Sequence, residues 1–164
     1  MKSAGGVRPD LGWLKDPGHF IALGAGAGLA RVAPGTVGSV VGVGVYLALP
    51  PLQAIPAACV VLLMIVVGVP ICGRTARALG VHDHPSIVWD EVTGVVLTLV
   101  FSSGTWLGVG MGFLLFRIFD IWKPWPVRWA DGRVGGGFGV MLDDLLAAAY
   151  AAVGLVLFEY ISYS

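Results

Sequence analysis

The chain has 164 residues, of which 57% are hydrophobic and only 12% are charged, and its formal net charge is zero. A soluble domain of this size exposes too much surface for so few charges, since soluble domains usually have about 25% charged residues. The composition excludes a disordered chain and gives no electrostatic reason to expect a nucleic-acid partner. It indicates a single domain, residues 1–164, embedded in a lipid bilayer, with residues 1–16 as a flexible polar N-terminus.

Apolar, glycine-rich segments follow this N-terminus. Residues 20–30 are too few to cross a bilayer, so we expect a short interfacial or re-entrant segment there. The segment 36–50 is also short for a span, and its Gly38 and Gly42 form a small-xxx-small pair that favours close helix packing. The segment 52–72 is the first that is long and apolar enough to cover the roughly 30 Å of hydrocarbon.

Three more apolar segments lie in the second half of the chain. A helix is expected to begin near Pro85 and Ser86 and to occupy 86–102, because proline is favoured in the first turn of a helix. A tight turn then leads into 105–122, and a last apolar run covers 138–161. The predicted fold is therefore all-α, a polytopic transmembrane helical bundle with about four or five spans.

The charged residues lie at one face of this predicted bundle. If the N-terminus is inside, all ten Lys and Arg residues fall in or near the inner segments 1–35, 73–85 and 123–137. This distribution is the one that the positive-inside rule requires. Most carboxylates share the inner face, where they lie near helix ends: Asp83, Asp90, Glu91, Asp120, Asp131, Asp143 and Asp144.

Such a group of carboxylates needs a partner. Charges within membrane spans are costly and usually face the bundle interior or a water-filled cavity, and converging carboxylates repel one another. A hard divalent cation such as Mg²⁺, held by oxygen ligands, would neutralise them. Alternatively, each carboxylate forms an interfacial ion pair or favours a helix N-terminus through the helix dipole. The basic residues available for such pairing are Arg117, Lys123, Arg128, Arg133, His82 and His84.

Two loops add features that suit an anion. Pro34 and Gly35 break the backbone before a segment in which Thr36 is expected to cap a helix, leaving free N–H groups for a phosphate. An ordinary helix cap explains the same pattern. In the sequence His82-Asp83-His84, a histidine is suited to general acid or base chemistry near neutral pH, although an interfacial turn without catalytic function fits equally.

Four motifs closely resemble the phosphatidylglycerophosphatase A family of bacteria. They are Ala33–Ser39 (APGTVGS), His82–Glu91 (HDHPSIVWDE), Phe116–Pro126 (FRIFDIWKPWP) and Met141–Asp144 (MLDD), and the resemblance extends over about residues 17–150. It implies a Mg²⁺-dependent lipid phosphatase, a multi-pass protein of the bacterial cytoplasmic (inner) membrane. Such an enzyme removes the terminal phosphate of phosphatidylglycerophosphate on the cytoplasmic face and produces phosphatidylglycerol.

These motifs lead to specific expectations for the residues. We expect hydrolysis by a metal-activated water, with a covalent phospho-aspartate as the open alternative. The expected metal ligands are Glu91, Asp120, Asp143 and Asp144, with Asp90 as a further candidate. Asp90, Asp120 and Lys123 are also expected to act in catalysis. The expected phosphate-binding residues are Thr36, Ser39, Arg117, Lys123 and Arg128, and the expected proton donor is His82 or His84.

Two other classes of function remain open from the sequence. A transporter or channel would use the inner-face carboxylates as an ion site, and a structural subunit would not need them. A transport path requires ionisable residues through the membrane depth, yet no charged residue lies between Thr93 and Arg117 or between Leu145 and Phe158. The charge pattern therefore favours a one-sided site over a path.

Overall fold

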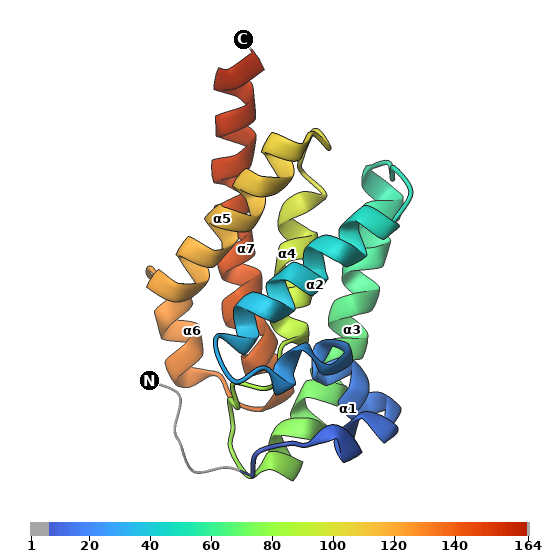
Figure 1. Cartoon of the computed structure of the whole chain (residues 1–164). Helices are drawn as coiled ribbons and strands as arrows, with labels where there is room; N and C mark the ends of the chain where they lie inside the picture. Colours follow the sequence, from blue (N-terminus) through green and yellow to red (C-terminus); the bar gives the residue numbers. More distant parts are fainter. Residues whose placement is uncertain (1–6, 164) are drawn as a thin grey trace.

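The computed structural model describes residues 7–163, and over that range helices are joined by turns and loops and there is no strand. Figure 1 shows a bundle of helices with the C-terminus at one end and α1 and α6 at the other. The all-α prediction is confirmed. In chain order the elements are the 3₁₀ helix η1 (Leu11–Lys15), α1 (Pro17–Ala22), the 3₁₀ helix η2 (Gly24–Leu29), α2 (Pro34–Ala48), α3 (Ala54–Leu79), α4 (Trp89–Leu99), α5 (Trp106–Trp122), α6 (Val127–Arg133) and α7 (Gly136–Tyr163).

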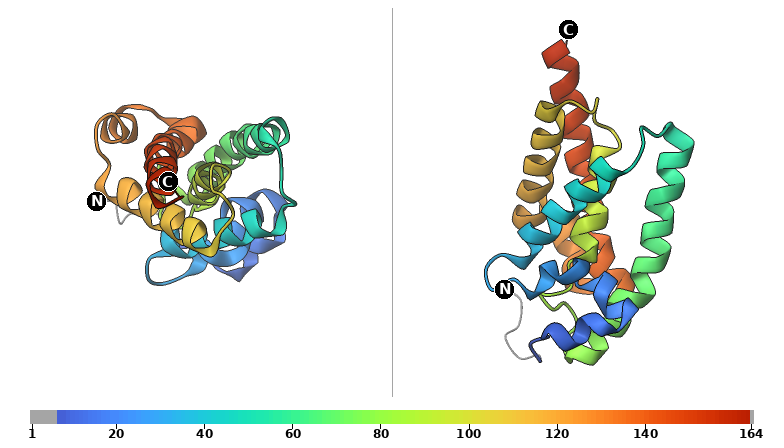
Figure 2. Two further views of the ribbon diagram at one scale, coloured as in Figure 1. Left: turned by 90° about the horizontal axis from the view of Figure 1, so that it is seen from above. Right: turned by 45° about the vertical axis from the view of Figure 1, so that its right-hand side comes forward.

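The short helix α4 forms the centre of the bundle. It packs against α2, α7, α5 and α3, and the view along the bundle shows it enclosed by its neighbours (Figure 2). Its side chains are buried on all sides, as the apolar residues Val92, Val95 and Val96 illustrate. A helix that is apolar all round belongs in a core, and α4 consequently fixes where the other helices can lie.

Glycines allow α2 to approach α4 closely. A Cβ atom on Gly38 would lie 2.6 Å from Val88 Cβ, and one on Gly42 would lie 2.9 Å from the carbonyl oxygen of Val92. Gly38 and Gly42 are the small-xxx-small pair noted in the sequence, and they face the central helix. The close approach brings the first turn of α2 beside the first turn of α4.

Several helix boundaries differ from the sequence-based expectation. Helix α4 begins at Trp89 rather than near Pro85, because the backbone before it forms a turn in which Ile87 N–H donates to the His84 carbonyl. Helix α3 continues past residue 72 to Leu79, where Gly80 ends it in the left-handed conformation that glycine adopts readily. Helix α6 was not predicted from the sequence, where residues 123–137 were expected only to form an inner segment between two spans.

Two helices are long and apolar enough to cross a membrane, namely α3 and residues 136–162 of α7. Helix α2 is apolar but has only 15 residues. By length alone, then, the structure supports two spans, and the four or five spans expected from the sequence are not confirmed.

The N-terminal segment packs beside α3. His19 Nδ1 lies 2.9 Å from Thr75 Oγ1, and Asp16 forms an ion pair with Arg74 at 2.6 Å. The hydrogen bond from Arg74 lowers the pKa of Asp16 below its usual value. Within the segment expected to be interfacial or re-entrant, a break at Ala25 (φ 55°) lies inside η2. Of the N-terminus expected to be flexible, residues 1–6 lie outside the described range.

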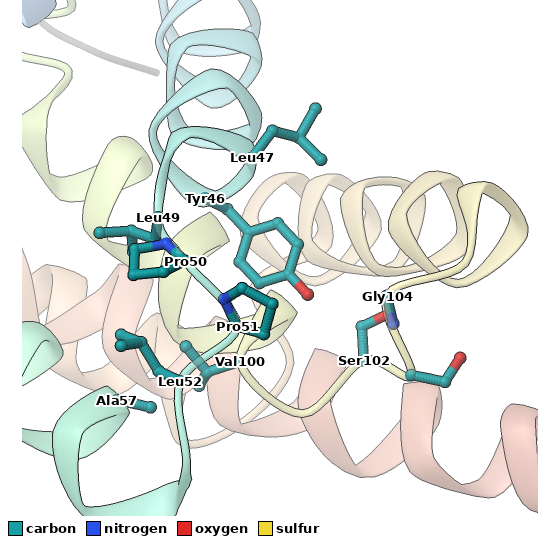
Figure 3. Close-up of a pocket in the computed structure, with 11 residues that line it drawn as sticks. Tyr46, Leu47, Leu49, Pro50, Pro51, Leu52, Ala57, Val100, Ser102 and Gly104 are labelled. Carbon is teal, nitrogen blue, oxygen red and sulfur yellow. The ribbon is translucent and has the colours of Figure 1, made fainter.

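The end of the bundle near the C-terminus is held by a different set of contacts. Glu159 of α7 accepts hydrogen bonds from the Ser103 backbone N–H at 2.9 Å and from the hydroxyl groups of Ser102 and Ser103. A hollow of about 350 Å³ lies beside this turn and is lined by residues such as Tyr46 and Pro51 (Figure 3). No acidic or basic side chain is among its lining residues.

The contact between α2 and α4 gives a test of the packing. We expect Gly42→Ala to destabilise the protein by about 1–3 kcal/mol, because the new methyl group overlaps the α4 backbone. Gly44→Ala is the matched control, since a Cβ there has no neighbour within 4 Å and alanine favours helix. Thermal denaturation in detergent measures both variants. Equal midpoints for the two would contradict the close approach.

Candidate functional site

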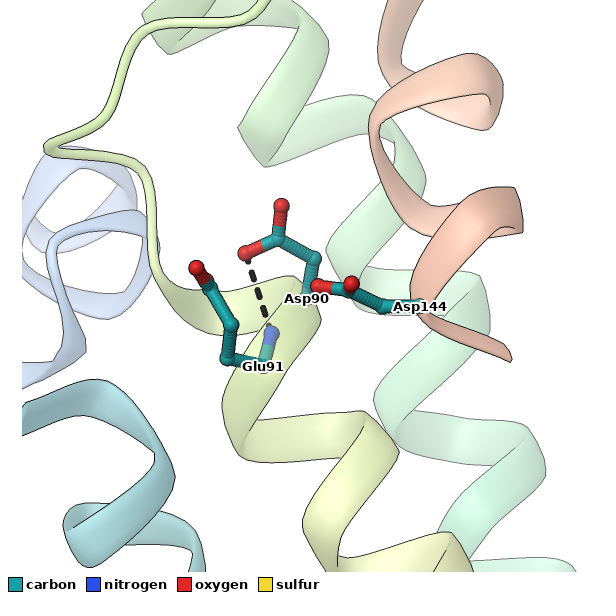
Figure 4. Close-up of side chains that lie close together, drawn as sticks. All are labelled: Asp90, Glu91 and Asp144. Atoms are coloured by element: carbon teal, nitrogen blue, oxygen red, sulfur yellow. Dashed lines mark hydrogen bonds between the residues drawn. The ribbon is translucent and has the colours of Figure 1, made fainter. Parts of the chain in front are cut away.

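Three carboxylates from two helices meet at the end of the bundle opposite to Glu159. Asp90 and Glu91 lie in the first turn of α4, and Asp144 reaches them from α7 (Figure 4). One oxygen from each of the three lies within 4.8 Å of the others. All three side chains are buried, with exposed fractions of 3%, 5% and 4%. Like charges this close and this well buried repel strongly unless a cation or protons neutralise them.

The oxygens of this group are only partly satisfied by the protein. Asp90 Oδ1 accepts a hydrogen bond from the Glu91 backbone N–H at 3.0 Å, which is the helix-end role that the sequence also allowed. Glu91 Oε2, in contrast, is buried and has no hydrogen-bond partner among the described residues. An orphaned carboxylate oxygen beside two more carboxylates is the donor set that a hard cation such as Mg²⁺ requires. The residues present therefore fit such an ion.

The remaining two carboxylates of the expected ligand set, Asp120 and Asp143, have cationic partners. Asp120 forms an ion pair with Arg117 one turn earlier on α5. Asp143 Oδ2 lies 2.6 Å from Lys123 Nζ, which also contacts Asp131 Oδ1 at 2.7 Å. The structure thus separates the predicted set into three carboxylates without a cationic partner among the described residues (Asp90, Glu91 and Asp144), called unpaired below, and two carboxylates that hold a basic side chain in place.

Lys123 occupies a constrained position at the end of α5. Its backbone is in the left-handed region (φ 48°, ψ 63°), which a side chain with a Cβ rarely adopts. Burial lowers the pKa of its ammonium group, but the charge of Asp143 and hydrogen bonds to Asp131 and Asp143 outweigh this effect and hold the pKa above its usual value. Lys123 therefore remains a cation throughout the physiological pH range.

These groups line one cavity of about 280 Å³, which we call the carboxylate cavity. Within it, Arg117 Nε is buried and donates to no acceptor in the described part of the chain. The cavity thus combines an unpaired acceptor, Glu91 Oε2, with an unpaired donor, which suits a ligand made of a cation and an oxyanion. Its lining residues are Pro34, Gly35, Asp83, Pro85, Asp90, Glu91, Arg117, Asp120, Ile121, Lys123, Asp143 and Asp144.

The first turn of α2 contributes backbone to this cavity. A Cβ on Gly35 would overlap Glu91 Oε1, so any larger residue there would displace the Glu91 carboxylate. Ser39 donates to the Gly35 carbonyl at 2.9 Å and accepts from Arg117 at 3.3 Å, which places it behind the cavity wall. The expectation that Thr36 caps this helix is wrong, because α2 begins at Pro34 with Ala33 as its cap, and Thr36 does not line the cavity.

The two histidines lie behind the cavity wall. His82 Nε2 accepts a hydrogen bond from the Gly136 backbone N–H at 2.6 Å, and His84 Nδ1 accepts one from the Ser86 N–H at 3.1 Å. Neither residue is among those that line the cavity, whereas Asp83 between them is. Nothing in the sequence favoured Asp83, since only the geometry of the turn decides which of three adjacent residues lines the cavity.

Arg128 is also separate from the carboxylates. It is exposed on α6 and lines a second hollow of about 550 Å³ with Trp122, Lys123, Pro124, Trp125 and Trp129. We call this hollow the aromatic groove. Of the basic residues expected to bind phosphate, Arg117 and Lys123 line the carboxylate cavity, and Arg128 lines only the groove beside it.

Comparisons with known proteins agree on one family. A sequence model of the family described as Phosphatidylglycerophosphatase A matches residues 20–159. The chain is similar to Phosphatidylglycerophosphatase A of Escherichia coli (strain K12), with 44% identity over 140 residues, covering 85% of this chain and 81% of the relative. The corresponding protein of Haemophilus influenzae is 41% identical over 149 residues, covering 90% and 91%.

A more distant relative has a different name. A protein of Bacteroides thetaiotaomicron, provisionally named a phosphatidylinositol-3-phosphatase, is 35% identical over 142 residues, covering 82% of this chain and 88% of the relative. No solved structure matches the chain.

The unpaired carboxylates predict a specific response to divalent cations. Millimolar Mg²⁺ should raise the Tm of the detergent-solubilised protein, because a ligand that binds the folded state stabilises it. The bound cation would also reduce the repulsion between the three carboxylates. Asp144→Asn should lose most of this increase. Glu159→Gln, at the other end of the same helix, should keep it. A Tm increase of the same size in Asp144→Asn would contradict the assignment.

Proposed function

Because this chain belongs to the phosphatidylglycerophosphatase A family, we propose that it hydrolyses the terminal phosphomonoester of phosphatidylglycerophosphate to phosphatidylglycerol and phosphate. The observation that supports this most directly is the carboxylate cavity, where three unpaired carboxylates face two basic side chains that other carboxylates hold in place. A divalent cation would match the carboxylates, and the phosphate that it accompanies would match the basic side chains.

We place the protein in the bacterial cytoplasmic (inner) membrane as a multi-pass protein, with the cavity on the cytoplasmic face. The length and composition of α3 and α7 support this placement. The positions of the Lys and Arg residues support the orientation, since they fall in or near the segments expected on the inner face. In this proposal α2, α4 and α5 lie within the membrane beside these two spans and complete the bundle, and the four or five spans expected from the sequence stay a prediction.

We assign Asp90, Glu91 and Asp144 as the residues that hold Mg²⁺. When bound, Mg²⁺ polarises a phosphoryl oxygen and lowers the pKa of a bound water. Asp120 and Asp143, which the sequence suggested as further ligands, have a different task in this proposal. Their ion pairs with Arg117 and Lys123 keep these two cations oriented toward the cavity.

Arg117 and Lys123 bind the phosphate that is removed. Charge that develops on the phosphoryl oxygens is stabilised best by donors that are already in position and need not reorganise. Arg117 is held by Asp120 and Ser39, and it retains a buried Nε–H that no described residue accepts. Lys123 has a raised pKa, so it supplies a permanent charge and is poorly suited to give up a proton.

In the reaction the bond between phosphorus and the glycerol oxygen breaks, and an oxygen from water ends on the phosphate. We favour direct attack by water over a covalent phospho-aspartate, because the paired carboxylates Asp120 and Asp143 are occupied by cations. We propose that the leaving glycerol oxygen takes its proton from water. His82 and His84 then act by positioning the turn that carries Asp83 into the cavity wall.

The proposal predicts the effect of removing one ligand. Asp144→Asn should lower kcat for phosphate release from phosphatidylglycerophosphate by roughly 10³-fold or more, because it removes a charge that acts in the transition state. The same assay with phosphatidylinositol-3-phosphate tests the activity named for the distant relative. Glu159→Gln should retain activity within about threefold. Full activity in Asp144→Asn would refute the proposed site.

The histidines provide a second, opposite prediction. His82→Gln should lower kcat by less than about tenfold and should not change the pH dependence of kcat, because Gln keeps an acceptor for the Gly136 N–H. A pH profile between 5.5 and 8.5 measures this. The sequence-based role of His82 as proton donor would instead remove the basic limb of that profile.

The transporter or channel alternative is less well supported. An ion path needs ionisable groups through the depth of the bundle, but no charged residue lies between Thr93 and Arg117 or between Leu145 and Phe158. The carboxylate cavity therefore belongs to one face of the protein, as an enzyme acting on lipid headgroups requires.

A further inference from the structure

The aromatic groove contains three tryptophans around two basic residues. Trp122, Trp125 and Trp129 are 71%, 79% and 48% exposed, although each presents a large apolar ring. Tryptophan at the level of lipid headgroups is favoured because its ring is apolar and its N–H is polar. The groove is thus suited to the region of a lipid where glycerol and acyl chains meet the headgroup.

The groove and the carboxylate cavity share one residue. Lys123 lines both hollows, and its ammonium contacts Asp143 of the cavity and Asp131 of α6. An ammonium group has three N–H donors, and these two contacts use two of them. A ligand that fills both hollows would therefore pass directly over Lys123.

The groove has an excess of positive charge. Arg128 makes no ion pair within residues 7–163, and the neighbouring Asp131 is already paired with Lys123. The walls are also fixed, because the Tyr150 hydroxyl of α7 donates to the Trp125 carbonyl at 2.9 Å, and the Arg128 N–H donates to the Pro124 carbonyl. An exposed guanidinium that has no carboxylate partner among the described residues, and that lines a groove with three tryptophans, is complementary to a phosphodiester anion.

We propose that the aromatic groove binds the second phosphate of the substrate, the phosphodiester that joins its two glycerol units and is not hydrolysed. This inference rests on the proposed function, since it takes the lipid in the cavity to carry both a monoester and a diester. Arg128 then contacts the diester oxygens, the tryptophans contact the glycerol and acyl carbons, and the monoester lies beyond Lys123 in the carboxylate cavity. Arg128 is accordingly a specificity-determining residue that favours lipids with two phosphates over lipids with one.

Binding of two short-chain lipids to the full-length protein in detergent tests this assignment. Dihexanoyl phosphatidylglycerol has only the diester, and dihexanoyl phosphatidic acid has only the monoester. By calorimetry, Arg128→Gln should raise the Kd of the phosphatidylglycerol by about tenfold, the scale of one charge-assisted hydrogen bond, and should leave the Kd of phosphatidic acid within twofold. In turnover, the same variant should raise the KM for phosphatidylglycerophosphate and change kcat by less than about threefold.

Arg133→Gln is the matched control, because Arg133 is an exposed arginine of the same helix that lines neither hollow. It should bind both lipids as the unmodified protein does. Equal weakening of both lipids by both variants would show that α6 attracts anionic lipid nonspecifically, and the proposal would be overturned. It would also be overturned if the unmodified protein did not bind phosphatidylglycerol. Normal binding without release of phosphate would instead refute the proposed function and leave the groove assignment standing.

Discussion

Repulsion between three buried carboxylates is the constraint on which the arrangement of this protein depends. Two unit charges 4 Å apart interact by about 1 kcal/mol in water and about 4 kcal/mol at the effective dielectric constant of a protein. Asp90, Glu91 and Asp144 lie at this kind of separation and are nearly inaccessible to solvent. A fold that brings these three carboxylates together without a cation is less stable than it would be without the repulsion. Functional sites commonly reduce the stability of a protein in this way.

Within the described part of the chain, the surrounding residues leave the negative charge of these three carboxylates without a cationic partner. Arg117 and Lys123 line the same cavity, but Asp120, Asp143 and Asp131 hold them in separate ion pairs. Each cation is thus fixed at the edge of the cavity, where it is positioned for an anionic ligand. The same logic explains why five inner-face carboxylates, Asp90, Glu91, Asp120, Asp143 and Asp144, do not have one common role.

The helices place these groups through close backbone contacts. Helix α4 is short and central, so its first turn carries Asp90 and Glu91 at one end of the bundle while the rest of it forms the core. Gly38 and Gly42 let α2 approach α4, and Gly35 lets the backbone of α2 reach Glu91. Glycine is therefore used here to bring backbone up to a carboxylate, besides its general role in packing apolar helices.

The sequence predicted the helices and the convergence of carboxylates because both depend on patterns along the chain. Apolar runs revealed α2, α3, α5 and α7, and four motifs identified the family. The sequence did not reveal which carboxylates are paired, since Asp143 and Asp144 are adjacent and only their directions across the bundle distinguish them. For the same reason, the sequence did not show that Asp83 rather than the adjacent His82 lines the cavity. Helix α6 and the groove it forms were missed because prolines obscured the short helix.

The most direct test of this account is the position of a divalent ion. Mn²⁺ replaces Mg²⁺ at oxygen sites, and its anomalous scattering would locate it in crystals of the protein. We predict a peak within coordination distance of Asp90, Glu91 and Asp144, with the Arg117–Asp120 and Lys123–Asp143 ion pairs intact. A peak bound instead by Asp120 and Asp143, with those pairs broken, would contradict the division between unpaired and paired carboxylates.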